Sequence, residues 1–393
     1  MARTVVLVNG ARTAIGDFGG ALKGMAPTAL GAIVAKEALA RAGVAPEDVG
    51  HTVFGNVIHT EPRDMYLSRV AAMDAGIPKE VPALTLNRLC GSGLQAIVSA
   101  AQSIMLGDAD VALAGGAESM SRSGHLTPAA RWGQKMGDIS GVDMMLGALS
   151  DPFGNGHMGI TAENVAERYQ VSRDTQDAFA LESHQRAEAA IAGGRFKDQI
   201  VPVELKTRKG TITFDTDEHV RNGAAAGDFA KLRPVFKKDG TVTAGNASGL
   251  NDAAAALVLM AEDEADRRGL TPMAKILGYA HAGVEPERMG IGPVPAVSKL
   301  LEKLGLKAGD LDVIESNEAF AAQACAVSKE LGLPAEKVNP NGGAIALGHP
   351  IGATGAIIAL KMLHELKRTG GRKGLATMCI GGGQGIALAV EAI

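Results

Sequence analysis

Cys90 is the residue of this chain whose surroundings point most directly to chemistry. It lies in the run LCGSG at residues 89–93, immediately before a predicted helix. A helix N-terminus offers free N–H groups and the positive end of a dipole, which favours thiolate over thiol. The adjacent glycines would let a substrate approach the backbone closely. A nucleophilic cysteine and a buried structural cysteine both remain open on this segment alone.

Two further residues near the C-terminus have side chains suited to proton transfer. His349 stands between Gly348 and Pro350, in a turn that we expect to be rigid. An imidazole there could act as the general base that removes the proton of Cys90, although a lone histidine is more often only a packed residue. Cys379 ends a predicted strand before three glycines. It could exchange protons beside backbone N–H groups that form an oxyanion hole, or it could be a core cysteine.

Asn317 begins the run NEAF at residues 317–320, at the expected start of a helix. Its side chain could cap that helix, hold a water molecule or polarise a carbonyl group. Cys325 falls in the alanine-rich part of the same helix, and we interpret it as a core residue.

The elements that must position these residues follow an α/β pattern. Apolar residues recur at helical spacing from Leu94 to Met105, and a short apolar run at 111–115 then predicts a strand. The C-terminal part repeats this alternation. We expect helices over 319–331 and 355–366 and strands over 375–380 and 386–390.

The two ends of the chain also resemble each other. When Cys90 is aligned with His349, Gly93 falls opposite Gly352, and each reactive-looking residue precedes small residues, a helix, a strand and a glycine pair. The segments 53–56 and 314–317 match as well. This favours a duplicated α/β unit, against the simpler explanation that any two α/β units look alike.

The segment between the two ends has a different character. It is more polar and rich in loops, with one helix signal over 175–192, and we interpret it as an insertion that covers something. Five basic residues lie close together in its second half, and on pattern alone they indicate a solvated face. They are Arg221, Lys231, Arg233, Lys237 and Lys238.

Composition narrows the classes of function. The 393 residues, 46% of them hydrophobic, can bury a large core, and a net charge of −4 suggests neither nucleic acid nor a membrane surface as a partner. The N-terminus lacks a signal-peptide pattern, and we expect no apolar stretch long enough to span a bilayer. Three scattered cysteines argue against a disulfide framework and for a reducing, cytoplasmic location.

Five blocks of this sequence resemble the signature blocks of the thiolase family, in the same order and over the whole chain. They are CGSG at 90–93, GGAESMS at 115–121, NEAF at 317–320, GHPIG at 348–352 and CIGGG at 379–383. Among thiolases the chain looks most like bacterial biosynthetic acetyl-CoA acetyltransferases. Residues 56–65 and 214–221 are similar to the β-ketothiolases that feed polyhydroxyalkanoate synthesis.

The resemblance implies an α/β thiolase fold. Two βαβαβαββ halves would stack as five αβαβα layers, with a loop domain inserted from the first half. On this sequence the N-terminal half covers 1–121 and continues over about 250–270, the inserted loop domain covers 122–249, and the C-terminal half covers 271–393.

The resemblance also implies roles for the reactive residues. Cys90 is the nucleophile that becomes acylated, and His349 is its base. Cys379 exchanges the α-proton of the second acetyl-CoA. One oxyanion site consists of His349 and a water held by Asn317, and the other of the backbone N–H groups of Cys90 and Gly381. No metal and no cofactor is implied, because CoA esters are the substrates.

CoA binding is implied mainly for the inserted segment. The residues carried over by position are Leu149, His157, Met158, Arg221, Ser248 and Phe320. Arg221 would hold the nucleotide end by charge, and Ser248 the pantetheine amide. The chain departs from its relatives at 224–228, where polar or acidic residues are commoner, and at Ala117, where methionine is commoner.

The implied activity is that of an acetyl-CoA C-acetyltransferase, an acyltransferase that makes or cleaves 3-ketoacyl-CoA by a reversible, ping-pong Claisen condensation. A degradative thiolase for longer chains in fatty acid metabolism is the main alternative. A ketoacyl synthase would pair its cysteine with two histidines, whereas this chain has Cys379. A catalytically inactive, lipid-binding relative would be expected to lack one of Cys90, His349 or Cys379. The resemblance further implies a homotetramer or homodimer, with 124–142 as the loop that forms the tetramer.

Overall fold

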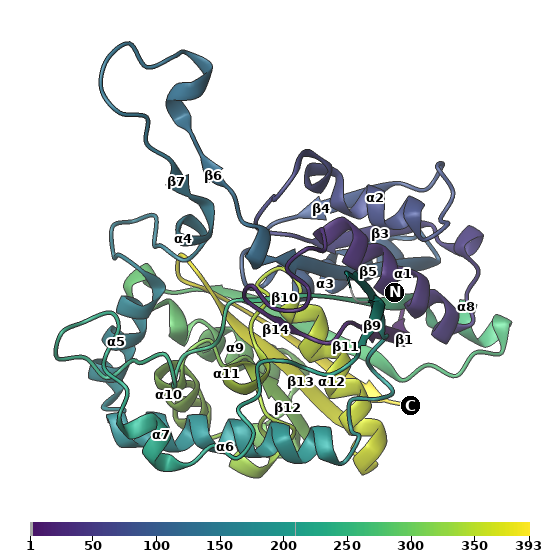
Figure 1. The fold of residues 1–393 in the computed structure, drawn as a ribbon. Helices are drawn as coiled ribbons and strands as arrows, with labels where there is room; N and C mark the ends of the chain where they lie inside the picture. Colours follow the sequence, from purple (N-terminus) through teal and green to yellow (C-terminus); the bar gives the residue numbers. More distant parts are fainter. Residues whose placement is uncertain (1–2, 209) are drawn as a thin grey trace.

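One large mixed sheet organises the molecule (Figure 1). The computed structural model describes residues 3–208 and 210–393, so Met1 and Ala2, at the start of the strand-like N-terminal run, lie outside the described residues together with Lys209. The strand order is β12 (Val313–Ser316), β13 (Lys373–Ile380), β14 (Gln384–Ala392), β11 (Ala274–Gly283), β1 (Val5–Arg12), β10 (Asn251–Ala261), β5 (Val111–Ser119), β3 (His51–Gly55) and β4 (Ala83–Leu86), with β2 (Gly16–Asp17) paired to β10.

The sheet consists of two similar halves joined at a narrow seam. Only Val6 and Leu7 of β1 pair with β11, at Lys275 and Ala274. On one side β3 runs parallel to β5, which pairs antiparallel with β10; on the other, β12 runs parallel to β13, which pairs antiparallel with β14. The predicted duplication is therefore present in the strand pairing.

Alternating residues on these strands create the layers. In β10, Leu257 and Leu259 face one core, whereas Val258 and Met260 face another, because successive side chains of a strand point to opposite faces. The first core holds the central helices α3 (Ser92–Leu106) and α12 (Thr354–Thr369) between the two half-sheets. The outer layers are α1 (Pro27–Ala42) with α2 (Leu67–Asp74) on one side, and α9 (Pro293–Leu304) with α10 (Ala321–Leu331) on the other.

This arrangement is the five-layer thiolase fold that the resemblance implied, and the predicted elements of both ends are confirmed with small shifts. Strand β5 continues to Ser119, beyond the predicted end. Helix α10 begins at Ala321, with Phe320 as its N-cap residue. Asn317 instead follows β12 directly, so the expectation that it opens or caps the helix was wrong.

The segment between β5 and β10 covers one end of the layers. Helix α6 confirms the predicted helix, and the hairpin of β6 and β7 stands away from the body in Figure 1. The five basic residues expected on a solvated face are all exposed. The elements here are β6 (His125–Leu126), β7 (Val142–Asp143), α4 (Met144–Ala148), α5 (Met158–Tyr169), α6 (Arg173–Ala192), β8 (Val203–Thr207), β9 (Gly210–Phe214) and α7 (Ala226–Ala230).

Two short α-helices and several 3-10 turns complete the chain. The helices are α8 (Glu262–Arg268) and α11 (Ala344–Leu347). The turns are η1 (Pro46–Asp48), η2 (Pro62–Tyr66), η3 (Met120–Arg122), η4 (Pro128–Arg131), η5 (Pro286–Ile291), η6 (Ala308–Asp310) and η7 (Ala335–Lys337).

One helical window in the described part of the chain is long and apolar enough to cross a membrane by length and composition, contrary to the expectation from the sequence. It is Leu89–Leu106, and 56% of it is buried inside the protein. The window coincides with α3, whose buried residues belong to the central layer.

Candidate active site

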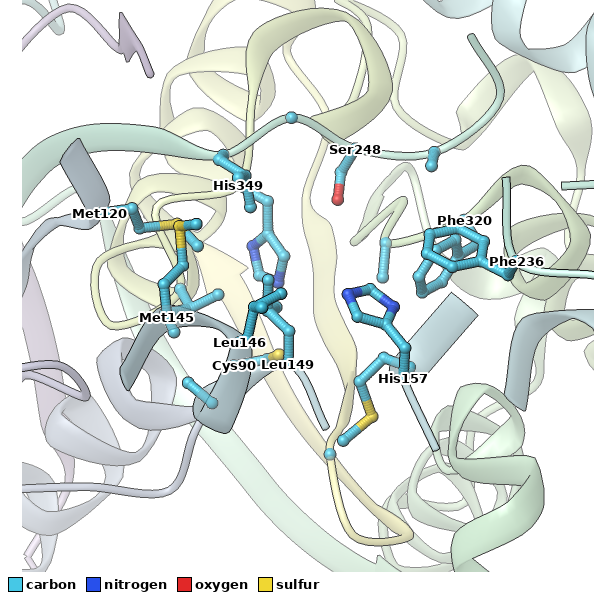
Figure 2. Close-up of a pocket in the computed structure, with 18 of the residues that line it drawn as sticks. Cys90, Met120, Met145, Leu146, Leu149, His157, Phe236, Ser248, Phe320 and His349 are labelled. Carbon is cyan, nitrogen blue, oxygen red and sulfur yellow. The ribbon is translucent and has the colours of Figure 1, made fainter. Parts of the chain in front are cut away.

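A pocket of about 340 Å³ opens where the N-terminus of α3 meets the inserted segment (Figure 2). Its wall is mainly apolar, with methionine, leucine and phenylalanine side chains around a few polar groups. The residues predicted for the site that line it are Cys90, His349, Gly381, Leu149, His157, Met158, Ser248 and Phe320. Chain segments far apart in the sequence therefore meet in one cavity.

A tight turn presents Cys90 at the pocket wall. Leu89 has a positive φ of 44°, which is rare for a residue with a branched side chain and costs conformational energy. The Ser92 hydroxyl supports this turn, because it donates to the Leu89 carbonyl at 2.7 Å and accepts from the Arg88 N–H at 2.8 Å. At Gly91, a Cβ would lie 2.6 Å from the Ile380 side chain, so glycine permits the end of β13 to pack against the cysteine turn.

A second turn positions His349. Gly348 has a φ of 108°, and a Cβ there would collide with the Asn251 side chain at 2.4 Å. Asn251 Oδ1 accepts the His349 backbone N–H at 2.9 Å. On the ring, Nδ1 lies 2.7 Å from the hydroxyl of Thr354, which itself donates to the Pro350 carbonyl at 2.9 Å.

These two contacts determine which ring nitrogen carries the proton. The single hydroxyl proton of Thr354 is given to Pro350, so its oxygen must accept a proton from Nδ1. Nε2 therefore keeps its lone pair, and it has no hydrogen-bond partner among the described residues. An unprotonated Nε2 beside the pocket is the state that a general base requires.

Burial disfavours the charged forms of both Cys90 and His349. Burial raises the pKa of Cys90 to about 11, although the Gly381 backbone N–H donates to its sulfur and acts in the opposite direction. Burial also lowers the pKa of His349 to about 4. This shift runs against the expectation that the thiolate is favoured, because loss of hydration outweighs the backbone N–H groups of Gly381 and Cys90 that bond the sulfur.

Cys379 lies beneath the pocket wall rather than on it. Its side chain is fully buried at the end of β13, packed with Met158, Met289 and Phe320, which do line the pocket. Burial raises the pKa of the Cys379 thiol, and the nearby sulfur of Cys90 raises it further. The two thiols are thus close enough to interact electrostatically.

Asn317 lies outside this pocket. It borders a separate internal cavity of about 10 Å³ behind the end of β12, and Thr354 lines the same cavity. The Asn317 side chain is 1% exposed, and neither Oδ1 nor Nδ2 has a hydrogen-bond partner in the described structure. A buried amide with free bonding capacity fits a residue that holds water.

Aromatic side chains line the part of the pocket formed by the inserted segment. The rings of His157 and Phe236 stack with centroids 4.6 Å apart, and Phe236 meets Phe320 edge-on at 6.4 Å. Ser248 is held by its backbone N–H, which donates to the Ala319 carbonyl at 3.0 Å. Sequence reasoning missed Phe236, which stands in a polar, basic run without any apolar periodicity.

Arg221 and the divergent segment 224–228 lie outside the pocket wall. Arg221 is exposed, and its guanidinium donates at 3.3 Å to the carbonyl of Ala244, which belongs to the wall. Sequence reasoning also missed Met289, Met145 and Leu146, which complete the apolar wall. Among the described residues, no cluster of His, Cys, Asp and Glu could hold a metal ion.

Comparison with known proteins agrees with this architecture. Residues 5–263 match the family model of the thiolase N-terminal domain, and residues 270–392 match that of the thiolase C-terminal domain. The β-ketothiolase BktB of Cupriavidus necator is 68% identical, with 100% of both chains covered. An acetyl-CoA acetyltransferase of Chromobacterium violaceum is 55% identical, covering 98% of this chain and 99% of the relative.

A solved structure shows the same fold. Human mitochondrial 3-ketoacyl-CoA thiolase superimposes with a TM-score of 0.98 at 46% identity, covering 100% of this chain and 99% of that one. The same human protein has also been solved in complex with CoA, with a TM-score of 0.96 at 46% identity over 100% of this chain and 98% of that one.

Proposed function

This chain belongs to the thiolase family, and on that premise we propose that it is an acetyl-CoA C-acetyltransferase. As an acyltransferase, it joins acetyl-CoA to a second acetyl-CoA or a short acyl-CoA, and cleaves the resulting 3-ketoacyl-CoA in the reverse direction. The observation that carries the proposal is the meeting of Cys90, the bare Nε2 of His349 and the Gly381 N–H at one apolar pocket.

In the first half-reaction, Nε2 of His349 takes the proton of Cys90 as the sulfur attacks the thioester carbon of acetyl-CoA. The negative charge moves to the carbonyl oxygen and returns as the C–S bond to CoA breaks. The departing CoA thiolate then takes the proton of Cys379, so Cys379 becomes a thiolate while His349 keeps the Cys90 proton on Nε2. An acetyl group then remains on Cys90. The lowered pKa of His349 disfavours a free thiolate–imidazolium pair, so the proton transfer accompanies attack on the substrate.

In the second half-reaction, the Cys379 thiolate removes a proton from the α-carbon of the second acetyl-CoA. The resulting carbanion attacks the acetyl carbon on Cys90, a carbon–carbon bond forms, and the Cys90 sulfur leaves and takes back the proton held by His349. Hydrogen bonds to the two developing oxyanions lower both barriers, one from His349 and an Asn317-held water, the other from the N–H groups of Cys90 and Gly381. Loss of one such donor typically costs about 10²–10³ in rate.

We assign CoA binding to the pocket wall formed by the inserted segment. Leu149, Met158 and Phe320 supply apolar surface, the stacked ring of His157 narrows the passage, and Ser248 offers a hydroxyl to the pantetheine amide. The exposed Arg221 holds the nucleotide phosphates beyond the mouth. No metal and no additional cofactor takes part in this scheme.

The same proposal covers the location, the pathway and the assembly of the enzyme. The enzyme works in the cytoplasm, supplies polyhydroxyalkanoate synthesis, in keeping with its likeness to BktB, and assembles as a homotetramer through the protruding 124–142 loop. The degradative alternative for longer chains gains no support from the curated relatives.

The decisive experiment mixes purified protein with acetoacetyl-CoA and free CoA and follows the loss of the enolate absorbance. The wild-type chain should show rapid thiolysis, and Cys90→Ser, the closest change in shape, should show almost none. A series of 3-ketoacyl-CoA substrates of increasing length should give the highest kcat/KM at about four or five carbons. Absence of thiolysis by folded wild-type protein would refute the proposal.

A further inference from the structure

A buried ion pair that the reaction scheme does not use lies behind the candidate active site. Lys361 of α12 and Glu315 of β12 are 2% and 1% exposed, and Nζ lies 2.9 Å from Oε2. Nζ also donates to the Gly342 carbonyl at 2.7 Å. Burying two charges is seldom a net gain in stability over apolar residues of similar volume, so this pair calls for a role other than stability.

The pair borders the small cavity that also contains Asn317. The cavity measures about 10 Å³, close to the minimum that one water molecule needs. Its lining includes Glu315, Ser316, Asn317 and Lys361. Glu315 Oε1, Ser316 Oγ and both polar atoms of the Asn317 side chain have no hydrogen-bond partner within 3–208 and 210–393. The Lys361 ammonium has a third N–H to donate.

Two neighbouring polar side chains, Asn339 and Thr354, cannot take the place of a water. Asn339 Oδ1 already accepts the Ser316 backbone N–H, and its Nδ2 group donates to the Ser316 carbonyl and to Glu318. Thr354 is committed to His349 and Pro350. No contact in the described structure therefore fixes which end of the Asn317 amide faces the cavity.

We propose that this cavity holds one ordered water, through which the Lys361–Glu315 pair orients the Asn317 amide for catalysis. The water accepts an N–H from Lys361 and donates its two protons, one to Glu315 Oε1 and one to Asn317 Oδ1. The Nδ2 group of Asn317 then points away from the cavity and can donate to the oxyanion-site water. Lys361 and Glu315 are positioning residues in this arrangement, which rests on the proposed function for the role of Asn317.

A double-mutant cycle tests the proposal. The double variant Glu315→Leu/Lys361→Met removes both charges together, so neither is left buried alone. It is made once in the wild-type protein and once in the Asn317→Ala variant. Asn317→Ala alone should lower kcat for condensation about 10²-fold. In the wild-type background, the pair replacement should lower kcat at least about tenfold and change KM less than about twofold. In the Asn317→Ala background, the same replacement should change kcat less than about twofold.

The matched control is a second fully buried ion pair, Arg12 with Asp217, whose side chains are both 0% exposed. Arg12→Met/Asp217→Leu should leave kcat per folded enzyme unchanged, whatever it does to stability. All rates are divided by the folded fraction measured by circular dichroism, so partial unfolding does not imitate a catalytic defect.

The outcomes separate the two proposals. Inactive wild-type protein would refute the function itself. An active wild type whose pair replacement keeps kcat, or loses the same factor with and without Asn317, would overturn the positioning role. A high-resolution crystal structure should show a water between Lys361, Glu315 and Asn317, and a dry cavity would also overturn it.

Discussion

Nδ1 of His349 lies 2.7 Å from the hydroxyl oxygen of Thr354, five residues later and at the first position of α12. Because that hydroxyl gives its proton to the Pro350 carbonyl, the contact fixes the tautomer of the imidazole. A helix start that follows the histidine directly thus supplies the group that prepares Nε2 as a base. Every step that we assign to His349 depends on this short local contact.

Thr354→Val should lower kcat about tenfold with little change in KM. Valine has a similar shape but cannot accept the Nδ1 proton, so the imidazole is free to adopt the wrong tautomer and Nδ1 is left buried without a partner. Steady-state thiolysis of acetoacetyl-CoA measures the effect. Thr354→Ser keeps the hydroxyl and should retain nearly full activity; equal losses in both variants would argue against this role of the hydroxyl.

The alkylation of Cys90 in the free enzyme should accelerate steadily with pH. Since burial raises the pKa of Cys90 to about 11, the reactive thiolate is a small fraction near neutrality and grows about tenfold for each pH unit. Iodoacetamide labelling from pH 7 to 9.5, with loss of activity as the readout, should show no plateau. Cys90→Ser identifies the labelled site. A plateau near pH 7 would mean that the helix dipole prevails over desolvation.

Cys379→Ser should still become acylated at Cys90 but should lose condensation by at least about 10³-fold. Serine is nearly isosteric, but its hydroxyl is a far weaker acid than a thiol and cannot exchange the α-proton effectively. Mass spectrometry of the protein after incubation with acetyl-CoA detects the acetyl group, and a coupled assay follows acetoacetyl-CoA. Retention of condensation would remove Cys379 from the scheme, whereas loss of acylation would place its role earlier in the reaction.

Glu118→Gln should destabilise the protein by about 2–4 kcal/mol, because two N–H donors would face an amide nitrogen in place of an acceptor. The buried Glu118 carboxyl group accepts the backbone N–H groups of Val57, Ile58 and Gly352, and so connects the two halves of the fold near His349. Burial raises its pKa to about 8. Urea denaturation of both proteins measures the difference in the free energy of unfolding. Glu118→Asp, which keeps the carboxyl group but shortens the reach, is the companion variant. An unchanged midpoint in Glu118→Gln would show that these bonds contribute little.

Local sequence patterns were sufficient for most of the secondary structure. The periodicity from Leu94 to Met105 predicted α3, and the apolar run before Cys379 predicted β13, because each pattern reports one face of an element against a core. The boundary near Asn317 was missed. Its run resembles a helix cap, whereas pairing of the Asn317 backbone N–H with Thr377 keeps it beside β13.

The sequence alone determined which reactive side chains the chain carries, the elements next to them and the family resemblance. Cys90 before a helix and His349 between glycine and proline were visible as local patterns. Only the tertiary structure decided that these residues meet at one pocket, that Phe236 stacks on His157, and that Asn317 borders a separate cavity. The pKa of Cys90 was also decided there, because it depends on burial by distant segments, and this burial outweighs the backbone N–H groups that bond the sulfur.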